Sequence, residues 1–313
     1  MNSLLRGNAL LALAAAAMWG GGDFSGGMGV RSAGGGVHAA LRVVLLSHIA
    51  SFAVLAGIAR MRGDVFPHGA LLVWGLAAGA TGGLSLTGFY IALSRGAMGA
   101  SAAMSGLLAA AIPATLTLWQ AGSPGALPLL GFALAGGAIW LIAAGRTNDS
   151  ATHSEHGAAR GASILAMRGT SILAMLAGVG FGFYFVALKM ASPAGVIWPM
   201  ATARIGSLTI CSLTLLGMWL LPARVGAEPA KPSLKLSRKA AGWSLATALL
   251  DTSGNLLFLA ATRAGRLDVA AVLASLYPAS TILLAALALG ERPSRRQALG
   301  MATAVVAVAL IAM

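Results

Sequence analysis

The chain has 313 residues, of which 58% are hydrophobic and 9% are charged, and its net charge is +13. A soluble domain carries about 25% charged residues, so a chain this apolar along its whole length is not a soluble globular protein. The basic residues are scattered among short connections between apolar runs, which argues against a nucleic-acid-binding surface and for a role in membrane topology. The single cysteine, Cys211, excludes an internal disulfide and a CxxC metal or redox site.

Apolar runs follow one another along the chain, and a membrane crossing needs about 20 such residues. The connections between them are rich in glycine, proline and charge, as in "RMRGDVFPHG" and "GERPSRR". The first run also has the features of a signal peptide, but the internal repeat described next favours a retained helix. The ten predicted crossings are 8–30, 37–59, 69–93, 98–119, 126–145, 170–190, 197–220, 241–263, 268–288 and 297–313.

The two halves of the chain resemble each other in spacing. A shift of 162 positions places Arg42 on Arg204. A shift of 169 positions places Pro124 on Pro293, with no gap in the surrounding segment. The sequence therefore predicts an internal duplication.

The duplication predicts a first five-helix unit at 1–145, a polar linker at 146–169 and a second five-helix unit at 170–313. Because five is odd, the second unit must start on the opposite face of the membrane, which makes an inverted-topology repeat. We therefore predict an all-α integral membrane protein with ten transmembrane helices in two inverted repeats. In such folds the substrate binds near the midplane, and rocking of the repeats gives alternating access.

The distribution of basic residues bears on orientation. Connections on the side of the N-terminus carry six Lys or Arg, and those on the other side carry thirteen. The positive-inside rule then places both termini outside the cytoplasm.

Three features together resemble the EamA-type transporters of the drug/metabolite transporter superfamily. They are "WGGGDF" in the first helix, "LASLYPASTILLAALALGERPSRRQALG" near the end, and the two five-helix units. The resemblance implies ten helices, a central cavity, and export or uptake of small metabolites. It also implies cytoplasmic termini, against the charge count. The first half departs from the pattern, because Gly122 stands where the second half has Glu291.

Ionisable side chains inside membrane helices are costly and mark candidate functional sites. Asp23 lies four residues after Trp19, on the same helical face, in the glycine-rich stretch "WGGGDFSGG". The glycines allow a neighbouring helix to approach closely. Two interpretations stay open: Asp23 pairs with Arg42 and pins two helices, or it lines a cavity and binds a solute amine or a proton.

Asp251 and Asn255 are also four residues apart on one helical face. A carboxylate and an amide aimed the same way suit recognition of a small polar solute. The alternative is an interhelical hydrogen-bond network.

The repeat separates the roles of the embedded charges. Arg42 and Arg204 are equivalent under the shift, so we expect both to do the same framework job. Asp23 corresponds to Phe185, so this acid has no equivalent in the second unit. An asymmetric polar group in a pseudosymmetric scaffold suits an asymmetric substrate.

Four further residues are candidates. Tyr184 belongs to an aromatic cluster that could line a pocket for a cationic or amphipathic solute, or pack against the first helix. Tyr277 is placed to reach a cavity, and Pro278 beside it removes a helical hydrogen bond and favours a kink or hinge. His48 is either a hydrogen-bonded structural group or a proton relay.

The predicted site contains no catalytic or metal-binding residue and no cofactor. The predicted solute-binding residues are Trp19, Asp23, Tyr184, Asp251, Asn255 and Tyr277, and the predicted structural or coupling residues are Arg42, His48, Arg204 and Pro278.

We therefore expect a secondary transporter, an exporter of small metabolites or drugs, driven by protons or by exchange. No nucleotide-binding motif occurs in a usable context, so ATP does not drive it directly. Its expected partners are a small solute and membrane lipids, with no nucleic acid and with a homodimer as an open possibility. Its expected location is the bacterial cytoplasmic membrane. The competing hypotheses are a membrane enzyme acting on a lipid-linked substrate and a non-transporting scaffold or sensor.

Overall fold

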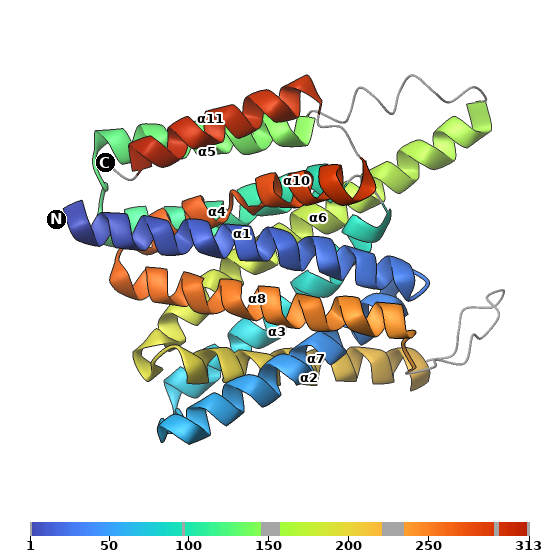
Figure 1. The fold of residues 1–313 in the computed structure, drawn as a ribbon, viewed down its shortest axis with the longest axis horizontal. Coiled ribbons are helices and arrows are strands. Elements are labelled where there is room, and N and C mark those ends of the chain that lie inside the picture. The colour runs from blue at the N-terminus through green and yellow to red at the C-terminus, as the bar shows by residue number, and fades with distance from the viewer. Residues whose placement is uncertain (1, 96–97, 145–156, 221–234, 291–293, 312–313) are drawn as a thin grey trace.

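The computed structural model describes residues 2–95, 98–144, 157–220, 235–290 and 294–311, which form helices and no strand (Figure 1). The helices are α1 (Asn2–Ser32), α2 (Gly36–Arg62), α3 (Ala70–Arg95), α4 (Met98–Ala121), α5 (Ala126–Ala144), α6 (Gly157–Ala191), α7 (Ile197–Leu220), α8 (Arg238–Ala264), α9 (Leu267–Ala274), α10 (Tyr277–Leu289) and α11 (Arg295–Ile311). A 3-10 turn, η2 (Ser192–Ala194), joins α6 to α7.

Membrane-crossing segments are abundant in the described part of the chain. Seven segments there are long and apolar enough to cross a bilayer, one of them made of α9 and α10 together. The helices α5 and α11 are shorter, with 19 and 17 residues. The glycines and Asp23 of α1 dilute its apolar character. The predicted all-helical membrane protein is confirmed, with seven crossings, rather than ten, supported by length and composition.

The predicted ninth crossing, 268–288, is broken into two helices. The helix α9 ends at Ala274, and α10 begins at Tyr277 with Pro278 in its first turn. Proline has no N–H to donate, and its ring clashes with the carbonyl four residues earlier. In α4, by contrast, Pro113 lies within a helix that continues to Ala121.

The boundary between the predicted halves differs from the expectation at one end. The helix α6 begins at Gly157, so the last part of the predicted linker 146–169 is helical. Glu291 and Pro293 lie outside the described residues.

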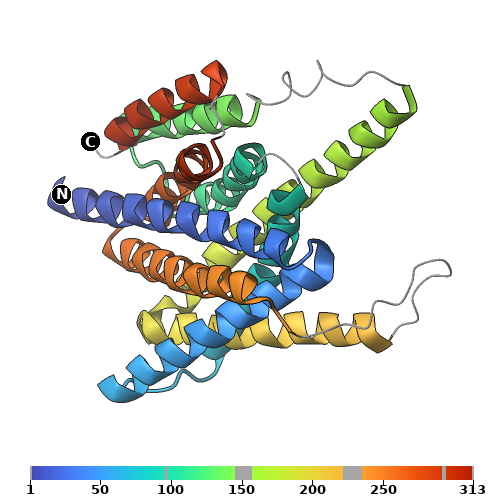
Figure 2. The same ribbon diagram turned by 45° about the vertical axis from the view of Figure 1, so that its right-hand side comes forward.

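The helices pack in pairs that join the first half of the chain to the second. The helix α1 packs most extensively on α8, α3 on α6 and α7, and α5 on α11. Figure 1 shows α5 and α11 together at one edge of the bundle, with α2 and α7 at the opposite edge. Figure 2 shows that the α5–α11 pair stays at this edge when the molecule is turned. The start of α1 and the end of α11 lie at the same end of the bundle.

The α3–α7 contact depends on two glycines that face backbone atoms. A Cβ on Gly79 would overlap the carbonyl oxygen of Ala203, and a Cβ on Gly206 would overlap that of Leu76. Small residues at such positions let membrane helices approach closely, so that dispersion contacts hold them together.

Gly79→Ala and Gly206→Ala are each expected to lower the free energy of unfolding by about 1–3 kcal/mol, because the added methyl forces two backbones apart. Gly217→Ala is the matched control on α7, where nothing lies within 4 Å of the new methyl. Denaturation in mixed detergent micelles measures both. Equal stability of all three variants would contradict the close-contact role.

The connection between α8 and α9 is held by a charge pair. Arg266 Nε lies 3.0 Å from Asp268 Oδ1, and Arg266 Nη2 lies 2.8 Å from Oδ2. The buried Asp268 carboxylate also accepts a bond from the Val269 amide at 2.9 Å. The hydrogen bonds to Asp268 raise the pKa of the Arg266 guanidinium, which stays charged.

Arg266→Ala is expected to cost about 1–3 kcal/mol of stability, because it leaves a buried carboxylate short of donors. Thermal unfolding followed by circular dichroism measures the loss. Arg266→Lys should recover only part of it, since an ammonium cannot make the two parallel bonds. A fully stable alanine variant would show that the hydrogen bond from the Val269 N–H is enough to stabilise the Asp268 carboxylate.

Candidate functional site

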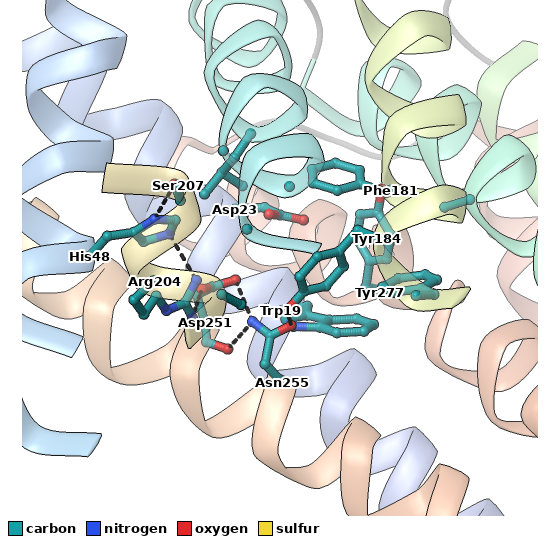
Figure 3. Close-up of a pocket in the computed structure, with 17 residues that line it drawn as sticks. Trp19, Asp23, His48, Phe181, Tyr184, Arg204, Ser207, Asp251, Asn255 and Tyr277 are labelled. Atoms are coloured by element: carbon teal, nitrogen blue, oxygen red, sulfur yellow. Dashed lines mark hydrogen bonds and ion pairs between the residues drawn. The ribbon is translucent and has the colours of Figure 1, made fainter. Parts of the chain in front are cut away.

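A small cavity of about 50 Å³ lies in the middle of the bundle, where helices of both predicted units meet (Figure 3). A cavity needs about 10–15 Å³ to hold one water, so this one has room for a few waters in the conformation described. Its lining side chains come from α1, α2, α3, α4, α6, α7, α8 and α10. The residues are Trp19, Asp23, His48, Gly79, Gly82, Gly83, Leu86, Ala109, Phe181, Tyr184, Phe185, Ala203, Arg204, Ser207, Asp251, Asn255 and Tyr277.

Arg204 on α7 is the centre of a polar network on one side of the cavity. Its Nη2 lies 2.6 Å from Asp251 Oδ2, its Nη1 lies 2.9 Å from His48 Nε2, and its Nε donates to Ser51 Oγ at 2.9 Å. The side chains of Arg204 and Asp251 are only 5% and 14% exposed. Ser51 also bonds Thr252 at 2.6 Å, so the network ties α2, α7 and α8 together.

The hydrogen bonds assign the tautomer of His48. A guanidinium has donors and no acceptor, so His48 Nε2 must accept from Arg204. Its Nδ1 therefore carries the proton and donates to Ser207 Oγ at 2.7 Å. His48 is thus a neutral imidazole with both ring nitrogens bonded, and Figure 3 shows its bonds to Ser207 and Arg204.

Asn255 extends the network toward α6. Its side-chain nitrogen donates to Asp251 Oδ1 at 3.0 Å, and its oxygen accepts from the Tyr184 hydroxyl at 2.5 Å. Both Asp251 oxygens are therefore engaged, one by Arg204 and one by Asn255. The predicted pair on α8 does form an interhelical network, and it does so on the cavity wall.

Asp23 differs from these groups because it has no such partner. Its side chain is buried, lines the cavity, and makes no hydrogen bond or ion pair to another described residue. The expectation that Arg42 neutralises it is not met. Arg42 lies in the second turn of α2, where it donates to the carbonyls of Ala33, His38 and Lys235.

The expected equivalence of Arg42 and Arg204 is also wrong in detail. Arg204 is buried in the central network, whereas Arg42 holds backbone carbonyls near the start of α2. Asp251 lies opposite Arg204, at 2.6 Å between Oδ2 and Nη2. Sequence symmetry identified equivalent backbone positions but not the partners of the side chains.

Aromatic rings form the other wall of the cavity. Trp19 stacks on Phe185 with ring centroids 5.2 Å apart and planes at 9°, and it also meets Phe258 and Tyr277 at 5.3 and 6.5 Å. Trp19 and Asp23 both line the cavity, which agrees with their four-residue spacing on α1. A carboxylate beside aromatic faces is a favourable setting for a cation.

Sequence reasoning did not identify Tyr90, Ser207 or the glycines of α3 as part of the site. Tyr90 lies on α3, and its hydroxyl is buried without a partner. It is one of only three tyrosines in the chain, and this rarity within an apolar helix was the available signal. Gly79 and Gly83 carry no side-chain chemistry, so only the packing of α3 on α7 reveals them.

No group of three His, Cys, Asp or Glu side chains that could hold a metal ion occurs among the described residues. The chemistry of the cavity is therefore that of one unpaired carboxylate, one neutralised ion pair, an amide, hydroxyls and aromatic faces. Such a set can bind and orient a small solute.

Comparison with known proteins gives three findings. The model of the EamA-like transporter family matches residues 169–313. One crystal structure superposes with a TM-score of 0.60 at 18% sequence identity, over 97% of this chain and 95% of its own, which shows a shared fold. No curated protein matches the chain. The chain is thus a multi-pass membrane protein, and its residues 169–313 match the EamA-like transporter family, which is part of the drug/metabolite transporter superfamily.

Proposed function

We propose that the chain is a secondary transporter that carries a small solute through the central cavity by alternating access. The observation that carries the proposal is Asp23, a buried carboxylate without a partner on the wall of a cavity between two sets of helices. A membrane protein gains nothing in stability from such a group, so a ligand or a proton is its natural partner.

The helix contacts support the two inverted repeats that alternating access needs. If the two units are equivalent, each contact between them should have a counterpart. The contact of α1 with α8 corresponds to that of α6 with α3, and the contact of α2 with α8 corresponds to that of α7 with α3. All four contacts are present. The contact of α1 with α9 and α10 likewise corresponds to that of α6 with α4. The family match begins at residue 169, one residue before the predicted start of the second unit at 170.

The cavity residues divide into two roles in this proposal. Trp19, Asp23 and Tyr277 contact the solute directly, because their polar atoms lack protein partners or their rings line the open wall. The bonded network of Arg204, Asp251, His48, Asn255 and Tyr184 fixes the opposite wall and presents a neutral polar surface to the solute. Pro278 places the break between α9 and α10 beside the cavity, as a hinge.

The transport cycle uses a proton gradient or exchange of solutes, and the working direction is export across the cytoplasmic membrane. Transporter-family membership of the second half favours this function over catalysis. A catalytic group built from Asp23, Arg42 and His38 would need these side chains together, but Arg42 donates to the backbone carbonyls of His38 and Ala33 rather than to Asp23.

Counterflow in proteoliposomes tests the proposal. Solutes that raise the melting temperature of the purified protein are loaded inside vesicles, and uptake of the labelled solute from outside is followed. We expect transient accumulation with the protein and none with empty vesicles. A pH gradient that drives uptake in the absence of internal solute would indicate proton coupling. Stabilising solutes that show no counterflow would favour a sensor instead.

A further inference from the structure

Three buried hydroxyl groups in the helices around the cavity have no hydrogen-bond partner of good geometry among the described residues. They belong to Tyr90 on α3, Ser105 on α4 and Tyr277 on α10, and the three residues are 0, 0 and 4% exposed. A hydroxyl buried in a membrane protein is normally bonded, because an unmade bond there is costly. Two of them, on Tyr90 and Tyr277, face one unpaired carboxylate, which indicates that a polar group enters this place.

Tyr90 is held beside Asp23 by a glycine. A Cβ on Gly26 would overlap the Tyr90 ring, so the ring lies directly on α1 at that point. Gly26 is three residues after Asp23, on the same face of the helix. The Tyr90 ring therefore lies one turn from Asp23 along α1, and Tyr277 lines the same cavity as Asp23.

Tyr277 reaches the same place from the other side. It lines the cavity, and its ring meets Trp19 and Phe89 edge-on with centroids 6.5 and 6.3 Å apart. Ser105 lies close enough to this hydroxyl to interact with it, although neither oxygen has a partner of good hydrogen-bond geometry among the described residues. The polar subsite, defined by Asp23, Tyr90, Ser105 and Tyr277, therefore draws on α1, α3, α4 and α10.

The chemistry of the polar subsite selects its ligand. Arg204 and Asp251 neutralise each other, so an ionised Asp23 gives the cavity one uncompensated negative charge. A carboxylate accepts hydrogen bonds only, and hydroxyl oxygens accept as well as donate. We infer that the polar subsite binds an ammonium group that carries N–H donors, while the aromatic wall at Trp19 receives the body of the solute. This inference rests on the proposed transport function and names the class of solute.

The test compares two cations with the same aromatic body. Benzylammonium has three N–H donors, and benzyltrimethylammonium has none, so only the first can bond the hydroxyls. Isothermal titration of the purified full chain in detergent should show tighter binding of benzylammonium. Tyr90→Phe and Tyr277→Phe, which keep the ring, should each weaken benzylammonium by about tenfold, the effect of one bond to a charged group. Both variants should leave benzyltrimethylammonium unchanged.

Thr303→Val is the control, because it removes an exposed hydroxyl that bonds only its own helix on α11. Phenylalanine variants that bind both cations like the wild type would overturn the inference and show that the hydroxyls hold water only. Equal binding of the two cations by the wild type, or binding of neither, would also overturn it. Counterflow separates the two ideas. If only a neutral or anionic solute is transported, the transport proposal holds and the ammonium site is wrong. If the cations bind but no solute is transported, the ammonium site holds and the transport proposal is wrong.

Discussion

Asp23→Asn is expected to reduce solute flux through the reconstituted protein by about 10- to 100-fold while the protein stays folded. The variant keeps the shape of the side chain and removes its charge. A bond between a charged protein group and a ligand contributes about 1.5–3 kcal/mol, which corresponds to this range. Because Asp23 has no partner among the described residues, its loss should break nothing in the fold. Counterflow and thermal unfolding of the same preparation measure the two effects.

Asp64→Asn is the matched control for this experiment. Asp64 lies in the connection between α2 and α3 and pairs with Arg62 at 3.4 Å, with the side chains 31% and 64% exposed. The same change of charge there should leave flux within about twofold, because exposed pairs contribute about 1 kcal/mol or less. Normal flux of Asp23→Asn at every pH would remove Asp23 from the site.

Arg204→Leu is expected to cost about 3–5 kcal/mol of stability, the largest loss for a single substitution in the central network. The change leaves Asp251 without its cation and takes the hydrogen-bond donor from His48 Nε2. An uncompensated buried charge dominates this cost, more than the lost attraction. Unfolding by denaturing detergent, followed by circular dichroism, measures it.

The double variant Arg204→Leu with Asp251→Leu shows whether the cost comes from the orphaned charge. Removing both charges should destabilise less than the sum of the two single changes, with a coupling of about 1–3 kcal/mol. Arg62→Leu is the control for loss of an arginine, since its exposed pair with Asp64 should matter by about 1 kcal/mol or less. Additive losses in the double variant would mean that each residue acts through other partners.

Much of the fold could be predicted because long apolar runs in the sequence identify membrane helices. Most predicted crossings agree with the helices to within a few residues, and Pro278 indicated a disturbance in the ninth. What the sequence could not provide was the lateral packing of the helices. Apolar periodicity carries little information about partners when lipid and protein interior are equally apolar. The sequence therefore left two interpretations of Asp23 open, pairing with Arg42 or lining a cavity. The packing of α1 on α8 and α10 was needed to choose between them.

The candidate site was likewise only partly predictable from the sequence. The embedded ionisable residues were identifiable because each is expensive in a membrane, and Asp23, His48, Arg204 and Asp251 all reached the cavity. Tyr90 was missed because an uncharged tyrosine costs less in a membrane than an ionisable side chain, so its rarity in the chain was the weaker signal. The assignment of Arg204, rather than Arg42, to the centre needed the actual distances to Asp251 and His48.

The position of α5 and α11 at the edge of the bundle separates the surface that contacts lipid from the cavity that would select the solute. Neither helix contributes a side chain to the cavity among the described residues, and their main contacts are with each other and with α4. The exposed apolar side chains of this pair, such as Trp140 and Val305, can thus be exchanged without touching the solute. Adaptation to a different lipid, or to a neighbouring chain, can proceed on these two helices while the helices that line the cavity keep the choice of solute.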